Sequence, residues 1–317
     1  MTRLTRISLP ALALIALTLP AADTFAQAGP AYTITQSGQT FAKLQDAVSA
    51  IGGGSGTIRV GNGRHQDCAV QTAGRIAYVA ATPGQAIFDG VTCEGKAALV
   101  LRGVSASVTG LVFTGMRVPD FNGAGIRLEH GDLTVSQAWF RDSQQGILTG
   151  PDPDGSLSVD QSTFSRLGTC EGAGGCAHSV YVGDYGSASI TRSRFEAGRG
   201  GHYLKSRAAK IAVLNSSFDD SAGRATNYMI DLPGGASGRI ANNWFVQGAN
   251  KENHSAFIAV AAEGKANSSA GLVVEANDAR MAPGVPWPSV FVADWSGDPL
   301  QIGTNKLDAR LKVKERR

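Results

Sequence analysis

Charged and aromatic residues are both scarce in this sequence. Asp, Glu, Lys and Arg make up 17% of its 317 residues, Phe, Trp and Tyr make up 7%, and the formal net charge is only +3. A positive charge this small and dispersed gives no reason to expect a nucleic-acid partner. Beyond residue 22, no apolar run reaches the ~18 residues that a membrane helix needs, so we expect no membrane span in the mature chain.

Helical periodicity and clustered carboxylates are also missing. Outside one segment near the N-terminus, apolar residues do not recur with the 3.6-residue period of an amphipathic helix, which excludes a helical repeat. No group of three or more carboxylates on neighbouring repeats marks a calcium site. We therefore expect neither a metal nor a cofactor.

The N-terminus has the pattern of a secretory signal peptide. Arg3 and Arg6 precede an apolar run, residues 7–22, that ends in small residues suited to peptidase cleavage. An uncleaved membrane anchor is the alternative, but Pro10 and Pro20 interrupt the run, which is short for a bilayer. We expect residues 1–28 to be removed and the mature protein to be periplasmic or secreted.

Four cysteines are an even count for an oxidising compartment, which predicts two disulfides. Sequence order favours the pairs Cys68 with Cys93 and Cys170 with Cys176. Zinc binding is the alternative, but Cys170 and Cys176 lack a CxxC spacing and have no paired-histidine motif nearby.

The chain is internally repetitive, and its 40 glycines indicate many short strands and turns. In six segments an aliphatic residue is followed five positions later by phenylalanine: Val108 to Phe113, Val135 to Phe140, Val159 to Phe164, Ile190 to Phe195, Val213 to Phe218 and Ile240 to Phe245. A second set of short strand-like runs lies between these copies, at residues 125–128, 146–148, 179–182, 202–205, 228–231, 256–260 and 290–292.

Two or three short strands in a repeat of irregular length are typical of a solenoid, whereas a propeller blade needs about 40 residues and four strands. The sequence predicts an all-β fold, a single-stranded right-handed parallel β-helix over residues 29–308, with the phenylalanines stacked as a ladder in its core. Residues 309–317 are expected to form a basic, solvated tail.

One short α-helix is expected to cap the N-terminal end of the solenoid. Apolar residues at 41, 44, 48 and 51 share one helical face, with Thr40 as the N-cap and Gly52 as the stop. Capped ends leave no free edge strands, which favours a monomer.

The segment Phe41-Ala-Lys-Leu-Gln-Asp-Ala-Val48, followed by Gly56-Thr-Ile-Arg-Val-Gly-Asn-Gly63 and the phenylalanine repeats, resembles bacterial right-handed parallel β-helix proteins of the pectin-lyase-like superfamily. The resemblance spans residues 31–308 and implies the fold. It implies no single reaction, because that superfamily includes polysaccharide lyases, epimerases, hydrolases and proteins of no known activity. The clustered aspartates of the pectate-lyase calcium site and of polygalacturonase-type hydrolases are absent from the sequence.

Aligning the core residues of consecutive repeats predicts an external column of ionisable residues. The valines of residues 179–182 should lie over Leu204 and then Ile230, so that the residues between them face outward. Tyr181, Lys205 and Asp231 then form one column on three adjacent coils.

Other polar residues are expected around this column. Those on or just beyond the strands are His178, His202, Asp184 and Arg207, with Arg127 two coils below and Glu263 and His254 at the rim. Aromatic surface for sugar rings is expected at Tyr181, Tyr203 and Tyr228. A bridge between Cys170 and Cys176 would pin the inserted loop as a groove wall.

This column has the groups needed to abstract a proton beside a sugar carboxylate: a base, a group that neutralises the carboxylate, and an acid for the leaving oxygen. Lys205 is the expected base. Arg127 or Arg207 is the expected carboxylate partner. The candidate proton donors are Tyr181, His178 and His202.

The preferred function is a lyase or C5 epimerase acting on an acidic polysaccharide in an external groove on the middle coils. One alternative is a glycoside hydrolase, for which Asp184 and Asp231 are the candidate carboxylates. Another is a non-catalytic glycan-binding or structural protein of the cell envelope. In that case Lys205 and Asp231 form a surface ion pair worth under ~1 kcal/mol.

Overall fold

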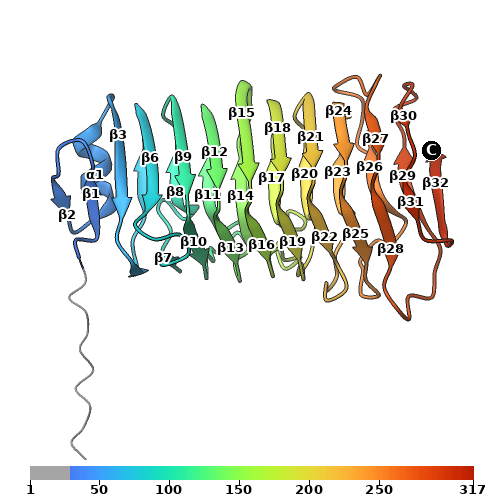
Figure 1. Ribbon diagram of the computed structural model, residues 1–317, viewed down its shortest axis with the longest axis horizontal. Coiled ribbons are helices and arrows are strands. Elements are labelled where there is room, and N and C mark those ends of the chain that lie inside the picture. The colour runs from blue at the N-terminus through green and yellow to red at the C-terminus, as the bar shows by residue number, and fades with distance from the viewer. Residues whose placement is uncertain (1–28) are drawn as a thin grey trace, which may run out of the picture.

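The structure, a computed structural model, describes residues 29–317. These residues form an all-β parallel solenoid of the right-handed type, in which successive coils stack along one long axis (Figure 1). Strands recur in the order first, second and third sheet, so that each sheet runs the length of the molecule. The signal peptide predicted at residues 1–28 lies outside the described residues.

The strands belong to three sheets. The first contains β2 (Thr40–Phe41), β1 (Tyr32–Ile34), β3 (Ser55–Val60), β6 (Arg75–Ala80), β9 (Ser105–Thr109), β12 (Asp132–Ser136), β15 (Asp152–Asp160), β18 (Tyr185–Thr191), β21 (Lys210–Leu214), β24 (Ser237–Ala241), β27 (Val273–Glu275) and β30 (Gln301–Ile302). The second contains β4 (Gly63–His65), β7 (Ala86–Asp89), β10 (Leu111–Thr114), β13 (Trp139–Arg141), β16 (Thr163–Ser165), β19 (Arg194–Glu196), β22 (Ser217–Asp219), β25 (Trp244–Gln247), β28 (Asp278–Met281) and β31 (Lys306–Leu307). The third contains β5 (Ala69–Gln71), β8 (Ala97–Leu101), β11 (Ala124–Leu128), β14 (Gln145–Thr149), β17 (Val180–Val182), β20 (Leu204–Ser206), β23 (Ile230–Leu232), β26 (Ala256–Val260), β29 (Ser289–Asp294) and β32 (Leu311–Arg316).

Alternation of apolar and polar residues decides which side chains enter the core. In β12, Leu133 and Val135 are buried while the residues between and beside them face outward. They pair in register with Leu157 and Val159 of the next coil. Like side chains therefore stack on like along the axis, which is how a solenoid builds a continuous core from coils too small to have one each.

The predicted phenylalanine ladder lies in this core, and Phe88 extends it by one coil. Neighbouring rings from Phe88 to Phe245 stack with centroids 4.7–5.5 Å apart, and all of them are buried. Stacked aromatic pairs contribute roughly 0.5–1.5 kcal/mol beyond their burial. The ladder therefore both fills the core and fixes the register of the coils.

A second ladder runs along the turn between the first and second sheets. In successive coils a residue with positive φ, such as Asn215 or Asn242, is followed by a polar residue that points inward. The side-chain oxygen of that residue accepts a hydrogen bond from the equivalent backbone N–H one coil earlier. The acceptors are Ser162, Ser193, Ser216, Asn243, Asn277 and Asn305. Buried turn amides are thereby satisfied along most of the solenoid.

The two ends differ in detail from the sequence expectations. Helix α1 (Leu44–Ile51) covers the N-terminal end beside β1 and β3 (Figure 1), and Gly52 ends it as predicted. Thr40 is not the N-cap, because it lies in β2; Asp67 instead accepts a hydrogen bond from the first helical N–H, at Leu44, over 2.7 Å. At the other end, residues 311–316 form β32 and pair with β29, so the expected solvated tail is part of the third sheet. No helix in residues 29–317 is long and apolar enough to cross a membrane.

Candidate active site

The outward face of the third sheet carries the predicted column of ionisable residues. Leu204 and Ile230 are buried register partners on β20 and β23, as expected from the repeat. In the same register Tyr181 pairs with Lys205, and Lys205 pairs with Asp231. The structure therefore brings these three side chains together in the predicted order.

A cavity of about 530 Å³ opens in front of this column. From the third sheet and its approaches it is lined by His178, Tyr181, His202, Lys205 and Arg207. Loops beyond the strands contribute Asn227, Glu252 and Glu263 to its rim. Most of the lining side chains are polar or ionisable, which is appropriate for a hydrophilic ligand such as a sugar.

Four of the ionisable side chains form one continuous chain of contacts with Tyr181. Lys205 Nζ lies 2.5 Å from Oε1 of Glu263 and 3.3 Å from Oδ2 of Asp231. Arg207 pairs with the other oxygen of Glu263 and donates from Nε to the Tyr181 hydroxyl at 2.9 Å. Burial opposes ionisation of Glu263, but hydrogen bonds from Lys205 and Arg207 hold its pKa below the ordinary value.

Asp231 is the most deeply placed member of this chain, with only 2% of its surface exposed. Its Oδ2 lies 3.3 Å from Nε2 of His202, and within residues 29–317 its Oδ1 has no hydrogen-bond partner. Burial raises the pKa of Asp231 to about 6, against the opposing effect of Lys205. This carboxyl group therefore changes its charge near pH 6, and such raised pKa values are common at functional sites.

The two histidine rings pack against each other at one end of the cavity, tilted by 31° and with ring centroids 5.0 Å apart. Burial lowers the pKa of His178 to about 3 and that of His202 well below its ordinary value, so both rings are neutral at pH 7. Nδ1 of His178 lies 3.0 Å from the backbone N–H of His202 and accepts its hydrogen bond. A neutral imidazole carries one proton, so the proton of His178 is on Nε2, where it can be donated.

Lys205 is not placed as the sequence hypothesis assumed. The hypothesis gave it the role of base beside Arg207, but its ammonium group forms ion pairs with Asp231 and Glu263, and Glu263 lies between it and Arg207. This arrangement favours Lys205 as a cation that binds carboxylates.

Three predicted residues lie away from the cavity. Tyr203 is buried in the core, where its hydroxyl donates to Asp220 at 2.8 Å, so the aromatic surface expected there does not exist. Tyr203 precedes β20, and the bend at that point turns its ring inward. Asp184 is exposed beyond β17 and does not line the cavity. His254 packs against Trp287, with the rings tilted by 30° and their centroids 4.4 Å apart.

Tyr228 and Arg127 lie at the edges of the site. Tyr228 extends the row of rings formed by His178 and His202, with its ring centroid 5.6 Å from that of His202. Arg127 lies two coils below Tyr181, as predicted, because Leu148 is the register partner of both. It lines a smaller adjoining cavity of about 290 Å³ rather than the main one.

Sequence reasoning missed a buried ion pair behind the cavity rim. The side chains of Lys251 and Asp220 are both fully buried, with Nζ 3.0 Å from Oδ2, and Thr226 and Tyr203 donate to the other aspartate oxygen. The next residue, Glu252, lines the cavity. No sequence signal distinguishes Lys251, because the segment from Gly248 to Asn250 before it has the composition of an exposed loop.

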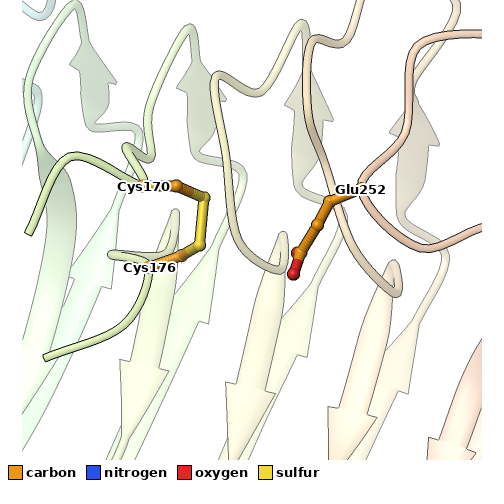
Figure 2. Close-up of side chains that lie close together, drawn as sticks. All are labelled: Cys170, Cys176 and Glu252. Atoms are coloured by element: carbon orange, nitrogen blue, oxygen red, sulfur yellow. A yellow bond between two sulfur atoms is a disulfide. The ribbon is translucent and has the colours of Figure 1, made fainter. Parts of the chain in front are cut away.

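Both predicted disulfides are present, joining Cys68 to Cys93 and Cys170 to Cys176. The second closes a loop whose residues Gly174, Gly175 and Cys176 form part of the cavity wall. Figure 2 shows Glu252 on a neighbouring loop opposite this disulfide, and its carboxylate lies within 4.8 Å of the sulfur atoms. The sulfur atoms are bonded to each other and offer no thiolate, so we assign no metal site to this group.

Similarity to known proteins is weak. No protein-family model matches the chain, and no curated protein matches its sequence. Among solved structures, the tailspike protein gp49 of Acinetobacter baumannii bacteriophage Fri1, a capsular polysaccharide depolymerase, aligns with 12% identity and a TM-score of 0.39. The alignment covers 85% of this chain and 59% of that chain, so this chain spans about three fifths of the tailspike's length. At this level the similarity assigns neither a family nor an activity to this chain.

Proposed function

We propose that this protein is an exported lyase or C5 epimerase that acts on an acidic polysaccharide in the cavity of the third sheet. The observation that carries the proposal is the unbroken chain of contacts from Tyr181 through Arg207, Glu263 and Lys205 to Asp231. Proton abstraction beside a carboxylate needs paired cations and a proton-transferring group within reach of one sugar. The two disulfides support export, because disulfides persist mainly in oxidising compartments.

Tyr181 is the proposed proton-transferring group. Its oxygen accepts a hydrogen bond from Arg207, so its own hydrogen is free to point into the cavity, and the guanidinium group would stabilise a phenolate. After its own proton has been lost to solvent, the Tyr181 phenolate would take the C5 proton of a uronate and become a phenol again. In a lyase the electron pair then forms the C4–C5 double bond, the C4–O bond breaks, and the leaving oxygen takes a proton. In an epimerase, a proton returns to C5 from the opposite face.

The remaining residues have distinct proposed roles. Lys205 and Arg207 would bind the uronate carboxylate after Glu263, whose side chain is 45% exposed, turns away from them. His178 would donate from Nε2, either to the leaving oxygen or to the opposite face of C5. Asp231, once ionised, would hold Lys205 and the ring of His202 in position.

The two alternative functions fare differently. A glycoside hydrolase based on Asp184 and Asp231 is disfavoured, because Asp184 lies outside the cavity. A non-catalytic glycan-binding protein needs the same cavity but no proton transfer. It remains the competing hypothesis.

Two readouts on a panel of acidic polysaccharides test the proposal. The unsaturated uronate made by a lyase is followed by its ultraviolet absorbance, and epimerase activity is followed by deuterium uptake at C5 in heavy water. Tyr181→Phe should abolish either signal, whereas Lys210→Ala, an exposed lysine on β21 outside the cavity, should not change it. Polysaccharide binding with no product and no deuterium uptake would favour the non-catalytic function.

A further inference from the structure

The main cavity continues along the solenoid axis into the smaller cavity that Arg127 lines. The two cavities share Asn122 and Leu148 in their walls. Leu148 is half-buried and is the register partner of Arg127 on one side and of Tyr181 on the other. The outward face of the third sheet therefore carries one groove that crosses several coils.

The side chain of Arg127 forms an ion pair with Glu129 but no hydrogen bond with any residue that the structure describes. Its Nε is buried without a partner, and within residues 29–317 its guanidinium group donates no hydrogen bond. Its nearest carboxylate oxygen, Oε1 of Glu129, is 3.5 Å away. Lys96 and Arg102 hold the two oxygens of Glu129 more closely, at 2.8 and 2.5 Å, so this carboxylate is shared among three cations. Arg127 therefore shares its ion-pair partner with two other cations, and its buried Nε–H has no acceptor among the described residues. A ligand carboxylate would supply that acceptor.

We propose that Arg127 forms a second subsite, which binds the carboxylate of another uronate in the same polysaccharide chain. This rests on the proposed function and adds a direction to it: the polymer would lie along the solenoid axis, across the strands. β11 and β20 are three strand spacings apart, which is about 14 Å at the usual separation of neighbouring strands. The groove thus fits an oligosaccharide, and Leu148 offers an apolar surface to the ring between the two charged positions.

A binding series with Arg127→Gln tests this subsite. Calorimetry would compare uronic acid oligosaccharides, of the galacturonate and alginate types, from the disaccharide to the octasaccharide. For the longer oligosaccharides the variant should bind about tenfold more weakly, as expected for the loss of one charge-assisted hydrogen bond, while disaccharide binding stays unchanged. Arg141→Gln is the matched control, since Arg141 lies on β13 of the second sheet and lines neither cavity.

Equal weakening for short and long oligosaccharides would overturn the proposal, because Arg127 would then bind the same sugar as Lys205. An unchanged affinity for the long oligosaccharides, or no binding of any acidic oligosaccharide, would also overturn it. A length-dependent loss of binding in a protein that makes no product would leave the subsite standing and remove the proposed reaction. The two proposals can therefore fail separately.

Discussion

Lys205 and Glu263 are joined by a 2.5 Å ion pair although they are 58 residues apart in the sequence. The same carboxylate also pairs with Arg207, so Glu263 occupies the place between two cations where a substrate carboxylate would bind. Glu263 and a substrate carboxylate would therefore compete for Lys205 and Arg207.

Replacing this competitor should strengthen binding. Glu263→Gln removes the negative charge but keeps the size of the side chain, so Lys205 and Arg207 become available to a uronate. We expect the affinity for a uronic acid oligosaccharide to rise about tenfold, measured by calorimetry, on the scale of one charge-assisted contact. Glu275→Gln is the control, because Glu275 pairs with Arg239 on the first sheet. A fall in affinity would instead mean that Glu263 itself contacts the sugar.

The neutral histidines should make the protein sensitive to acid. The folded-state pKa of His178 is lowered from 6.5 to about 3, so its contribution to stability is present above pH 6.5 and is lost as the pH falls toward 3. Urea unfolding between pH 7 and pH 4 should therefore show a shallower loss of stability in His178→Gln than in the wild type. The raised pKa of Asp231 acts in the opposite sense, since it favours the fold below about pH 4, but it is present in both proteins. Parallel pH profiles would contradict the assignment.

Breaking the buried ion pair behind the cavity should be strongly destabilising. Lys251→Met leaves Asp220 buried without its cation, which typically costs about 3–5 kcal/mol. Chemical denaturation measures this loss. The double variant Lys251→Met with Asp220→Asn should recover part of it, because no uncompensated charge remains. If the single and double variants are equally unstable, packing rather than charge accounts for the effect.

The phenylalanine ladder should be most sensitive at its middle. Phe164 stacks on both neighbours, with centroids 4.9 and 4.7 Å away, and is fully buried. Phe164→Ala should lower the free energy of unfolding by about 3–5 kcal/mol, because adjacent coils cannot close the resulting space. Trp139→Ala on the same sheet, where the residue is 37% exposed, should have a much smaller effect in the same denaturation assay.

The two disulfides should affect different properties. Cys68–Cys93 closes a loop of 25 residues and Cys170–Cys176 one of 6, so on the loop-entropy model serine replacement of the first pair should lower the melting temperature more. Replacement of the second pair should weaken oligosaccharide binding, because its loop forms part of the cavity wall. Each variant is the control for the other, and the reverse pattern would contradict both assignments.

The solenoid and the order of its column could be predicted because both depend on a local, repeated pattern. A coil contributes inward residues such as Val180 and Val182 with an outward one, Tyr181, between them, and alternation within a strand leaves little freedom in where these side chains point. The phenylalanine spacing then aligns the coils.

The partners of the column could not be predicted in the same way. Glu263 lies in an irregular loop after β26, and nothing in its local sequence shows that it reaches back two coils to Lys205. The prediction for Tyr203 was wrong for a related reason. This residue lies in a bend, where the alternation of inward and outward side chains no longer holds, and its hydroxyl donates a hydrogen bond to the buried Asp220. Loop geometry depends on contacts across the fold that a repeat pattern does not contain.

The hydrogen-bond ladder from Ser162 to Asn305 has an evolutionary consequence. Each coil within this ladder offers its neighbour on one side a backbone N–H and its neighbour on the other a side-chain oxygen, so the coils join through matching contacts. Duplicating or deleting one whole repeat would rejoin matching surfaces. During evolution the solenoid can thus lengthen or shorten by whole coils, while the residues of each remaining coil stay unchanged.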